Sequence, residues 1–246
     1  MPVFRERVDE APPRIVRDPT GWVRRTVSIN VDPVRLPGDL VIPTQARTVV
    51  LFAHGSGSSR RSPRNVAVAR RLNAAGLGTL LFDLLTRGES EDRSYVFDIP
   101  LLARRLRAAA LWIRHWPGIR DVPVAFFGAS TGAAAALVAA AAMPSETLAV
   151  VSRGGRPDLA GDALERVTAP TLLIVGGEDP GVLELNRAAL EQLRCEASLQ
   201  VVPGATHLFE EPGALERVAE LAAGWISEHL RLAEERQREA AIGGEV

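Results

Sequence analysis

The chain has 246 residues, of which 46% are hydrophobic and 24% are charged, a composition that excludes a disordered or a fibrous protein. The formal net charge of -1 provides no basic surface for a phosphate backbone, so we predict no nucleic-acid partner. All 29 basic residues are arginine, and a chain without lysine cannot use Schiff-base chemistry or a lysine-dependent phosphate loop.

The predicted strands begin after an N-terminal arm. Residues 1–20 combine prolines with alternating charges, which predicts an irregular arm. Residues 23–31 and 36–42 flank an Asp-Pro turn and are predicted to form two antiparallel strands at a sheet edge. Six short apolar runs follow, as expected for strands buried on both faces of a parallel sheet. These runs cover residues 48–53, 79–84, 124–127, 148–151, 171–175 and 199–202.

Helical segments alternate with these runs. The predicted helices cover residues 63–75, 98–115, 131–142, 181–194 and 212–235. Strands that alternate with helices predict βαβ units, and therefore a single α/β domain over residues 21–235 with a doubly wound, mostly parallel sheet. The short connection between the runs at 148–151 and 171–175 leaves no room for a large lid. Residues 236–246 are charged and then Gly-containing, which predicts a flexible C-terminal tail.

Several features concern the cellular compartment. The single cysteine, Cys195, cannot form an internal disulfide or a site with several thiolate ligands. The N-terminal sequence has charges and prolines where a secretory signal needs an apolar stretch, so we expect a cytoplasmic protein. Residues 125–143 are nearly uncharged and as long as a membrane span, but alanine dominates them and contributes little insertion energy. We therefore predict no membrane segment.

A candidate nucleophile follows the run at 124–127. The sequence Gly128-Ala129-Ser130-Thr131-Gly132 leads from this strand into an alanine-rich helix, which is the context of a G-x-S-x-G nucleophile elbow. The glycines allow a very tight turn, and the turn raises the hydroxyl of Ser130 above the sheet. The helix that starts there points N–H groups at the same place. The alternative is that Ser130 only caps the helix.

A serine nucleophile needs a base, and the base needs a carboxylate to orient it. In hydrolases with this elbow the acid and then the histidine follow the serine along the chain. His207 follows the last predicted strand, whereas the other histidines lie within predicted helices or before Ser130. The alternative for His207 is a residue at the entry to the final helix. The run at 171–175 is followed by Glu178 and Asp179, and we assign Asp179, with Glu178 as the alternative.

Two further roles remain to be assigned at this end of the sheet. Acyl transfer requires two donors for the oxyanion, and we assign the N–H groups of Thr131 and Ser56, with Gly57 as the next choice. Arg60 and Arg153 follow strands whose carboxyl ends form the same rim, so either residue could orient an anionic group on the substrate. The alternative is that the rim arginines pair with nearby acidic residues, which are Glu89, Glu91, Asp92 and Asp158.

The chain resembles the α/β-hydrolase superfamily and, within it, the dienelactone-hydrolase-like group of small bacterial hydrolases. The resemblance extends from about residue 22 to residue 232 and rests on the segments HGSGSSRRSPRN, GASTGAAAAL, SRGGRPDLAG, TLLIVGGEDP and PGATHLFEEPG. It implies a Ser130, Asp179 and His207 triad and ester-type hydrolysis. True dienelactone hydrolases have a cysteine in the elbow, paired with a glutamate where this chain has His54-Gly55, so the serine argues against dienelactone as the substrate.

We therefore predict a single-domain serine hydrolase that acts on a small carboxylic ester, lactone or thioester. No cluster of His, Cys and carboxylate residues has ligand spacing, so we expect neither a metal nor another cofactor. The expected partner is a small-molecule ester substrate, and the expected state is a monomer or a homodimer. The alternatives are an acyltransferase that uses the same triad, and a non-catalytic module that binds a ligand or a protein partner on the same fold.

Overall fold

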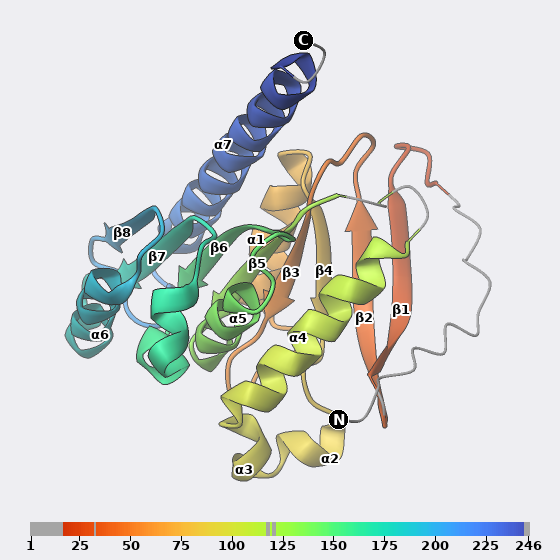
Figure 1. Cartoon of the computed structure of the whole chain (residues 1–246). Coiled ribbons are helices and arrows are strands. Elements are labelled where there is room, and N and C mark those ends of the chain that lie inside the picture. The colour runs from red at the N-terminus through yellow and green to blue at the C-terminus, as the bar shows by residue number, and fades with distance from the viewer. Residues whose placement is uncertain (1–16, 32, 117–118, 120–121, 244–246) are drawn as a thin grey trace, which may run out of the picture.

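An eight-stranded sheet forms the centre of the molecule (Figure 1). The computed structural model describes residues 17–31, 33–116, 119 and 122–243. The strands are β1 (Val23–Val31), β2 (Val34–Ile42), β3 (Val49–Ala53), β4 (Gly78–Phe82), β5 (Val124–Ala129), β6 (Thr147–Arg153), β7 (Thr171–Gly176) and β8 (Ala197–Val202). Their order in the sheet is β1-β2-β4-β3-β5-β6-β7-β8.

The sheet confirms the predicted α/β architecture. β1 and β2 are antiparallel to their neighbours at one edge, and all pairs from β4 to β8 are parallel. Every residue of β3 to β7 is buried, as the continuous apolar runs predict. β8 forms the other edge, where most of its residues are partly exposed. No large lid is present in the described part of the chain. The carboxyl ends of the central strands are therefore not covered by a large inserted segment.

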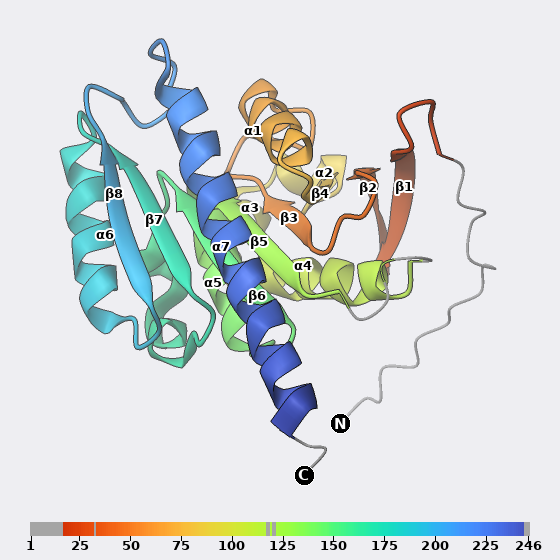
Figure 2. The same ribbon diagram turned by 90° about the horizontal axis from the view of Figure 1, so that it is seen from above.

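Helices cover both faces of the sheet. They are α1 (Pro63–Ala74), α2 (Arg87–Ser90), α3 (Arg93–Val96), α4 (Ile99–Arg114), α5 (Thr131–Ala141), the 3-10 helix η1 (Pro157–Arg166), α6 (Pro180–Gln192) and α7 (Ala214–Gly243). α1 and α7 pack together on one face, while α4, α5 and η1 pack together on the other. In Figure 2, α1 and α4 accordingly lie on opposite sides of the sheet. The sheet is thereby enclosed in two apolar layers.

The two layers follow from the alternation of side chains along each strand. Phe126 on β5 belongs to the core beneath α4 and α5, whereas the next residue, Phe127, belongs to the core beneath α1 and α7. Phe127 contacts Phe52 of β3 with ring centroids 4.9 Å apart. Both phenylalanines of β5 are fully buried. The strand that leads to Ser130 is therefore held from both faces.

The ends of the chain differ from the prediction at one point. Residues 236–243 continue α7, so the boundary expected at residue 235 is too early. Arginine, glutamine, glutamate and alanine dominate this stretch, and these are strong helix formers that need no buried face to extend a helix already begun. The C-terminal part of α7 extends beyond the sheet in Figure 1. Most of the predicted N-terminal arm (residues 1–16) and the last three residues of the predicted tail lie outside the described residues.

Segments that the sequence left ambiguous have defined places. No helix within the described ranges is both long and apolar enough to cross a membrane. The uncharged segment 125–143 instead supplies most of β5, then Ser130 and α5, which packs against the sheet.

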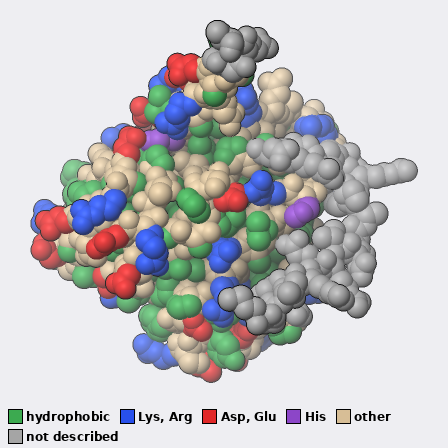
Figure 3. All heavy atoms as spheres, in the orientation of Figure 1, with side chains coloured by type: hydrophobic (Ala, Val, Ile, Leu, Met, Phe, Trp, Pro, Cys, Tyr) green, Lys and Arg blue, Asp and Glu red, His purple; other side chains and the backbone are tan. Residues whose placement is uncertain are grey.

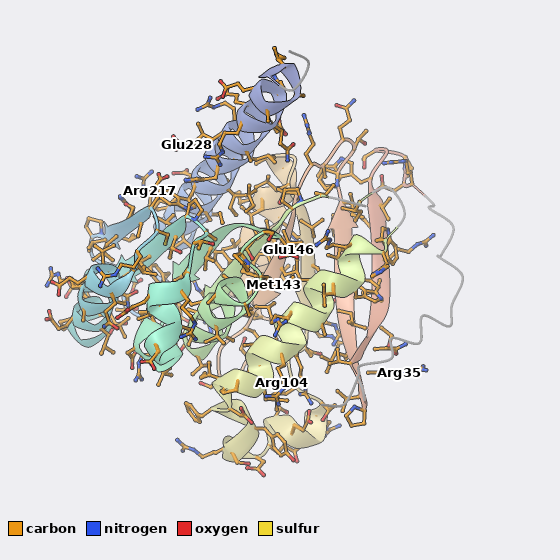
Figure 4. All side chains as sticks on the ribbon, viewed as in Figure 1. Arg35, Arg104, Met143, Glu146, Arg217 and Glu228 are labelled. Atoms are coloured by element: carbon orange, nitrogen blue, oxygen red, sulfur yellow. The ribbon has the colours of Figure 1, made fainter. Side chains whose placement is uncertain are left out.

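Glu146, which follows α5 and is labelled in Figure 4, pairs with Arg114 at the end of α4 at 3.5 Å. Acidic and basic side chains are interspersed over the face shown in Figure 3.

Candidate active site

Ser130 occupies a strained turn between β5 and α5. Its φ of 50° and ψ of -123° lie in a region that L-residues with side chains seldom adopt. The glycines on either side explain how the turn fits. A Cβ on Gly132 would lie 2.6 Å from the carbonyl carbon of Ala53, and a Cβ on Gly128 would lie 2.7 Å from the nitrogen of Ala133. The elbow predicted from the sequence is therefore present, with the serine at its tip.

Asp179 and His207 form a hydrogen-bonded pair. Asp179 immediately precedes α6 after β7, and His207 lies in the loop that follows β8. Nδ1 of His207 donates to Oδ2 of Asp179 at 2.7 Å, because an ionised carboxylate can only accept. Glu178 is exposed and contacts this loop only through its backbone N–H, which donates to Ala205 O at 2.9 Å. The structure thus pairs Asp179, not Glu178, with the histidine and leaves Nε2 of His207 free to accept a proton.

The segment that follows β6 connects the nucleophile with the histidine. The N–H of Ser130 donates to Arg153 O at 3.3 Å, and the N–H of Arg156 donates to Ser130 O at 3.1 Å. A Cβ on Gly154 would lie 3.5 Å from Cε1 of His207. Within the described residues no hydrogen bond joins Ser130 Oγ to His207, and such bonds commonly tighten only when substrate is bound. The three predicted triad residues thus lie at the same end of the sheet.

The loop after β3 lies against the start of α5. The N–H of Ser56 donates to Oγ1 of Thr131 at 3.1 Å. A turn closed by the N–H of Ser58, which donates to Gly55 O at 3.2 Å, gives this loop its shape. Gly57 has a φ of 67°, as the third residue of a type II turn requires. The two residues predicted to supply the oxyanion donors are therefore in direct contact.

His54 is a part of this site to which the sequence analysis gave no role. Its ring is buried, and Nε2 accepts a hydrogen bond from the N–H of Leu84 at 3.0 Å. Nδ1 donates to Gly55 O at 3.0 Å, so the carbonyl side of the Gly55–Ser56 peptide is held by the imidazole. Burial lowers the pKa of His54 and keeps the ring neutral. In the sequence, the only indication of this role for His54 was the His-Gly pair at the end of a predicted strand.

The guanidinium of Arg60 is not free, because it is paired with acidic side chains. Its guanidinium pairs with Asp83, which follows β4, and also with Asp39 of β2 at 3.1 Å. Its backbone N–H donates to Oδ1 of Asp83 at 2.7 Å. These bonds tie the loop after β3 to the neighbouring strands. The substrate role predicted for Arg60 is therefore not what its contacts indicate, and the pairing alternative holds with two acidic partners that the sequence had not suggested.

Arg153 differs from Arg60 because no acidic side chain of the described ranges pairs with it. The last residue of β6, it is 8% exposed, and its Nε and Nη1 atoms are covered without a hydrogen-bond partner. Burial, together with the nearby charge of Arg64, lowers the pKa of Arg153 to about 10. Two further arginines in loops at this end of the sheet are paired on the surface, Arg156 with Asp158 at 2.7 Å and Arg87 with Glu91 at 3.8 Å. Those two pairs follow the alternative left open by the sequence.

A small pocket lies beside the loop after β3. Residues 54–58 and Thr131 form its polar side, and Leu85, Val96 and Leu102 form its apolar side. The short helices α2 and α3, which the sequence analysis did not predict, bring Ser90 and Val96 to this pocket. In the described part of the chain, no group of three or more His, Cys, Asp and Glu side chains is placed to hold a metal ion. The pocket can accommodate a small apolar group next to Thr131.

A mostly parallel sheet whose central strand ends in a strained serine elbow is the fold of an α/β hydrolase. Within this class, a sequence model of the dienelactone hydrolase family matches residues 36–235, and the chain belongs to that family. The resemblance inferred from the sequence motifs is thereby confirmed.

Individual relatives agree with this assignment. A crystal structure of dienelactone hydrolase from Anabaena variabilis is 56% identical, with a TM-score of 0.81 over 84% of this chain and 98% of that one. Est1E from Butyrivibrio proteoclasticus shares the fold alone, with 18% identity and a TM-score of 0.71 over 84% of this chain and 99% of that one. A Mycobacterium tuberculosis protein whose name refers to phosphoribosyl transfer is 57% identical over 204 residues, which are 83% of this chain and 46% of that protein. The chain thus spans about half the length of the curated relatives it matches.

Proposed function

We propose that the protein is a serine hydrolase that cleaves small carboxylic esters, lactones or thioesters through an acyl-enzyme on Ser130. The observation that carries the proposal is the 2.7 Å hydrogen bond between Asp179 and His207, at the same end of the sheet as the strained Ser130. The two side chains lie in loops that follow separate strands, and packing alone does not require such loops to pair an aspartate with a histidine. Membership of a hydrolase family supports the same chemistry.

In the proposed reaction, Nε2 of His207 accepts the proton of the Ser130 hydroxyl while Oγ attacks the carbonyl carbon of the substrate. The imidazolium that forms is stabilised by the carboxylate of Asp179, which also holds the ring in the required tautomer. The tetrahedral intermediate then collapses, the bond to the leaving group breaks, and His207 returns the proton to that group. Water repeats the sequence on the acyl-enzyme and releases the carboxylic acid.

The negative oxygen of the intermediate requires two fixed donors. The N–H of Thr131 begins α5, where backbone N–H groups lack carbonyl partners and the helix dipole favours negative charge. The N–H of Ser56 is the second donor that we propose; its bond to Thr131 Oγ1 holds this loop at the N-terminus of α5, and the N–H would exchange the hydroxyl for the oxyanion when the intermediate forms. The pocket next to these donors is small, which favours a small group on the substrate.

Active-site labelling tests this proposal directly. A fluorophosphonate should react with the parent protein and should not react with Ser130→Ala, since only an activated serine is phosphonylated. For an activated aryl ester, the same variant should lose about 10⁴- to 10⁶-fold in kcat. Ser145→Ala is the matched control, because Ser145 is exposed in the loop between α5 and β6. An unlabelled and inactive parent would overturn the assignment and favour a non-catalytic role. Ser130→Ala with more than about a tenth of the parental activity would show that another residue is the nucleophile.

A further inference from the structure

Arg153 is a buried cation without a counter-ion. Two of its three guanidinium nitrogens, Nε and Nη1, are covered and make no hydrogen bond, although the residue as a whole retains 8% of its surface. Among the ion pairs of the described residues none includes Arg153, whereas Arg60, Arg105 and Arg156 each pair with a carboxylate. An unpaired buried charge is costly. The residual exposure shows that the side chain is not sealed from solvent.

The direction of the side chain follows from its strand. Ser152 points toward α5, since a Cβ on Gly155 would lie 2.6 Å from Cβ of Ala133 and would also overlap the Ser152 hydroxyl. Because successive residues of a strand point to opposite faces, Arg153 points toward the face covered by α1 and α7 (Figure 2). Arg64 in the first turn of α1 lies close enough for its charge to act on Arg153.

Among the described residues, no ion pair or hydrogen bond joins the guanidinium of Arg153 to an acidic side chain. Arg64 pairs with Glu210 at 2.8 Å through Nη1, and its own Nε is covered without a partner. Oδ1 of the neighbouring Asn65, which is also buried, lacks a partner as well. Oε1 of Glu211 accepts from the hydroxyl of Thr206 at 2.6 Å, and Oε2 of Glu211 is covered without a hydrogen-bond partner. The positive charge of Arg64 thus acts on Arg153, and no carboxylate of the described residues pairs with the Arg153 guanidinium.

This corner adjoins the proposed nucleophile. The carbonyl of Arg153 accepts the hydrogen bond from Ser130 N–H at 3.3 Å, and Ala129 is its register partner on β5. The distance from the guanidinium to the backbone of the elbow is therefore about the length of one arginine side chain. The small apolar pocket lies on the other side, toward α4 and Thr131. A substrate that used both places would extend from Ser130 in two directions.

We propose that Arg153, with Arg64 beside it, binds an anionic group of the substrate, a carboxylate or a phosphate. The inference rests on the proposed hydrolase function, because it places that anion on the ester cleaved at Ser130. A guanidinium binds either group through charge-assisted hydrogen bonds, which are about twice as strong as neutral ones. The anion supplies the missing counter-charge, so binding removes the cost of an unpaired buried cation. The preferred substrates are therefore anionic esters.

Matched esters test the inference by activity. We expect 4-carboxyphenyl acetate to have a kcat/KM at least about tenfold above that of 4-carbamoylphenyl acetate, or the same preference between phenyl 4-carboxybenzoate and phenyl 4-carbamoylbenzoate if the anion lies on the acyl arm. The preference should disappear in Arg153→Gln and fall with added salt. Arg156→Gln should keep it, because that guanidinium pairs with Asp158. Equal kcat/KM values within both ester pairs in the parent would overturn the inference.

Anion binding tests it without catalysis. Benzoate or inorganic phosphate should raise the Tm of the parent and of Ser130→Ala, whereas benzamide should not, and neither anion should raise the Tm of Arg153→Gln. Arg64→Gln, at a side chain that is 32% exposed, should weaken the effect without endangering the fold. If Ser130→Ala binds the anion but the parent cleaves no ester, the proposed function fails and the anion site stands. If the parent cleaves neutral esters and neither anion stabilises it, the anion site fails alone.

A purely structural role for Arg153 predicts a different result. If the guanidinium held the fold together, Arg153→Gln would lower the Tm in buffer without added anions. If it is an unpaired cation kept for a ligand, replacing it with a neutral side chain should leave the Tm unchanged or raise it. A lower Tm combined with an unchanged ester preference would therefore refute the inference.

Discussion

The N–H of Ser56 donates a 3.1 Å hydrogen bond to the hydroxyl of Thr131, the residue directly after the proposed nucleophile. Thr131 is buried, so its side chain has little freedom to turn away. One residue thereby contributes twice to the site, with its own N–H at the start of α5 and with a hydroxyl that orients the N–H of the opposite loop. The loop that carries Ser56 is thus held against α5 before substrate arrives, and the N–H proposed as an oxyanion donor has only to exchange one acceptor for another.

Thr131→Val should lower kcat for an activated aryl ester by about 10- to 100-fold, because valine keeps the shape but leaves Ser56 N–H without its acceptor. Thr131→Ser is the matched control and should retain most of the activity, since it keeps the hydroxyl. Steady-state kinetics on both variants provide the measurement. A valine variant as fast as the parent would show that the hydroxyl competes with the oxyanion and does not help to position its donor.

Asp179→Asn should reduce kcat by about 10⁴-fold, since an amide at this position favours the wrong tautomer of His207 and cannot stabilise the imidazolium. Glu178→Gln changes the neighbouring carboxylate in the same way, but Glu178 is exposed and makes only a backbone contact with the loop, so this variant should remain within about threefold of the parent. The comparison of the two values of kcat decides which carboxylate acts. A crippled Glu178→Gln with an active Asp179→Asn would reverse the assignment.

Most of the fold could be predicted because its signals are local. The apolar runs that became β3 to β7 are buried on both faces, and few other structures accommodate such runs between amphipathic helices. The elbow is likewise local, since Gly128, Ser130 and Gly132 lie within five residues. Chain order then limited the acid and the histidine to the ends of later strands.

The features that escaped prediction depend on contacts between distant segments. Thr131 and Ser56 are 75 positions apart, and neither sequence segment by itself predicts the hydrogen bond between them. Arg60 is neutralised by Asp83, which follows β4, and by Asp39 of β2, and both are distant from it in the sequence. The burial of Arg153 depends on packing between β6 and α7 that no periodicity reveals. The helices α2 and α3 have four residues each, too few to show a helical period.

The stability of the protein should depend on pH through His54. Burial lowers the pKa of this ring in the folded state, so between that pKa and the ordinary value of about 6.5 the unfolded chain binds more protons than the folded one. The free energy of unfolding should therefore fall as the pH drops below about 6.5. Protonation would also remove the lone pair with which Nε2 accepts from the N–H of Leu84.

Urea unfolding at pH 7.5 and pH 5.0 measures this effect. His54→Gln should show a smaller difference between the two pH values than the parent, because it removes the group responsible. His115→Gln is the control, since His115 is exposed at the end of α4, and its pH dependence should match that of the parent. An undiminished pH dependence in His54→Gln would show that other groups are responsible.

The elbow should not tolerate a side chain at Gly132. This requirement comes from packing, so it can be tested by measuring stability without measuring activity. A Cβ at this position would lie 2.6 Å from the carbonyl carbon of Ala53 and 2.7 Å from His54 O, and neither backbone group can move without shifting β3. Gly132→Ala should therefore lower the free energy of unfolding by about 3 kcal/mol or more in urea titrations. Gly88→Ala provides the contrast, because nothing lies within 4 Å of its Cβ and alanine favours a helix, so its stability should change by no more than about 1 kcal/mol. If Gly132→Ala were as stable as Gly88→Ala, β3 and the elbow could not pack as closely as the structure requires.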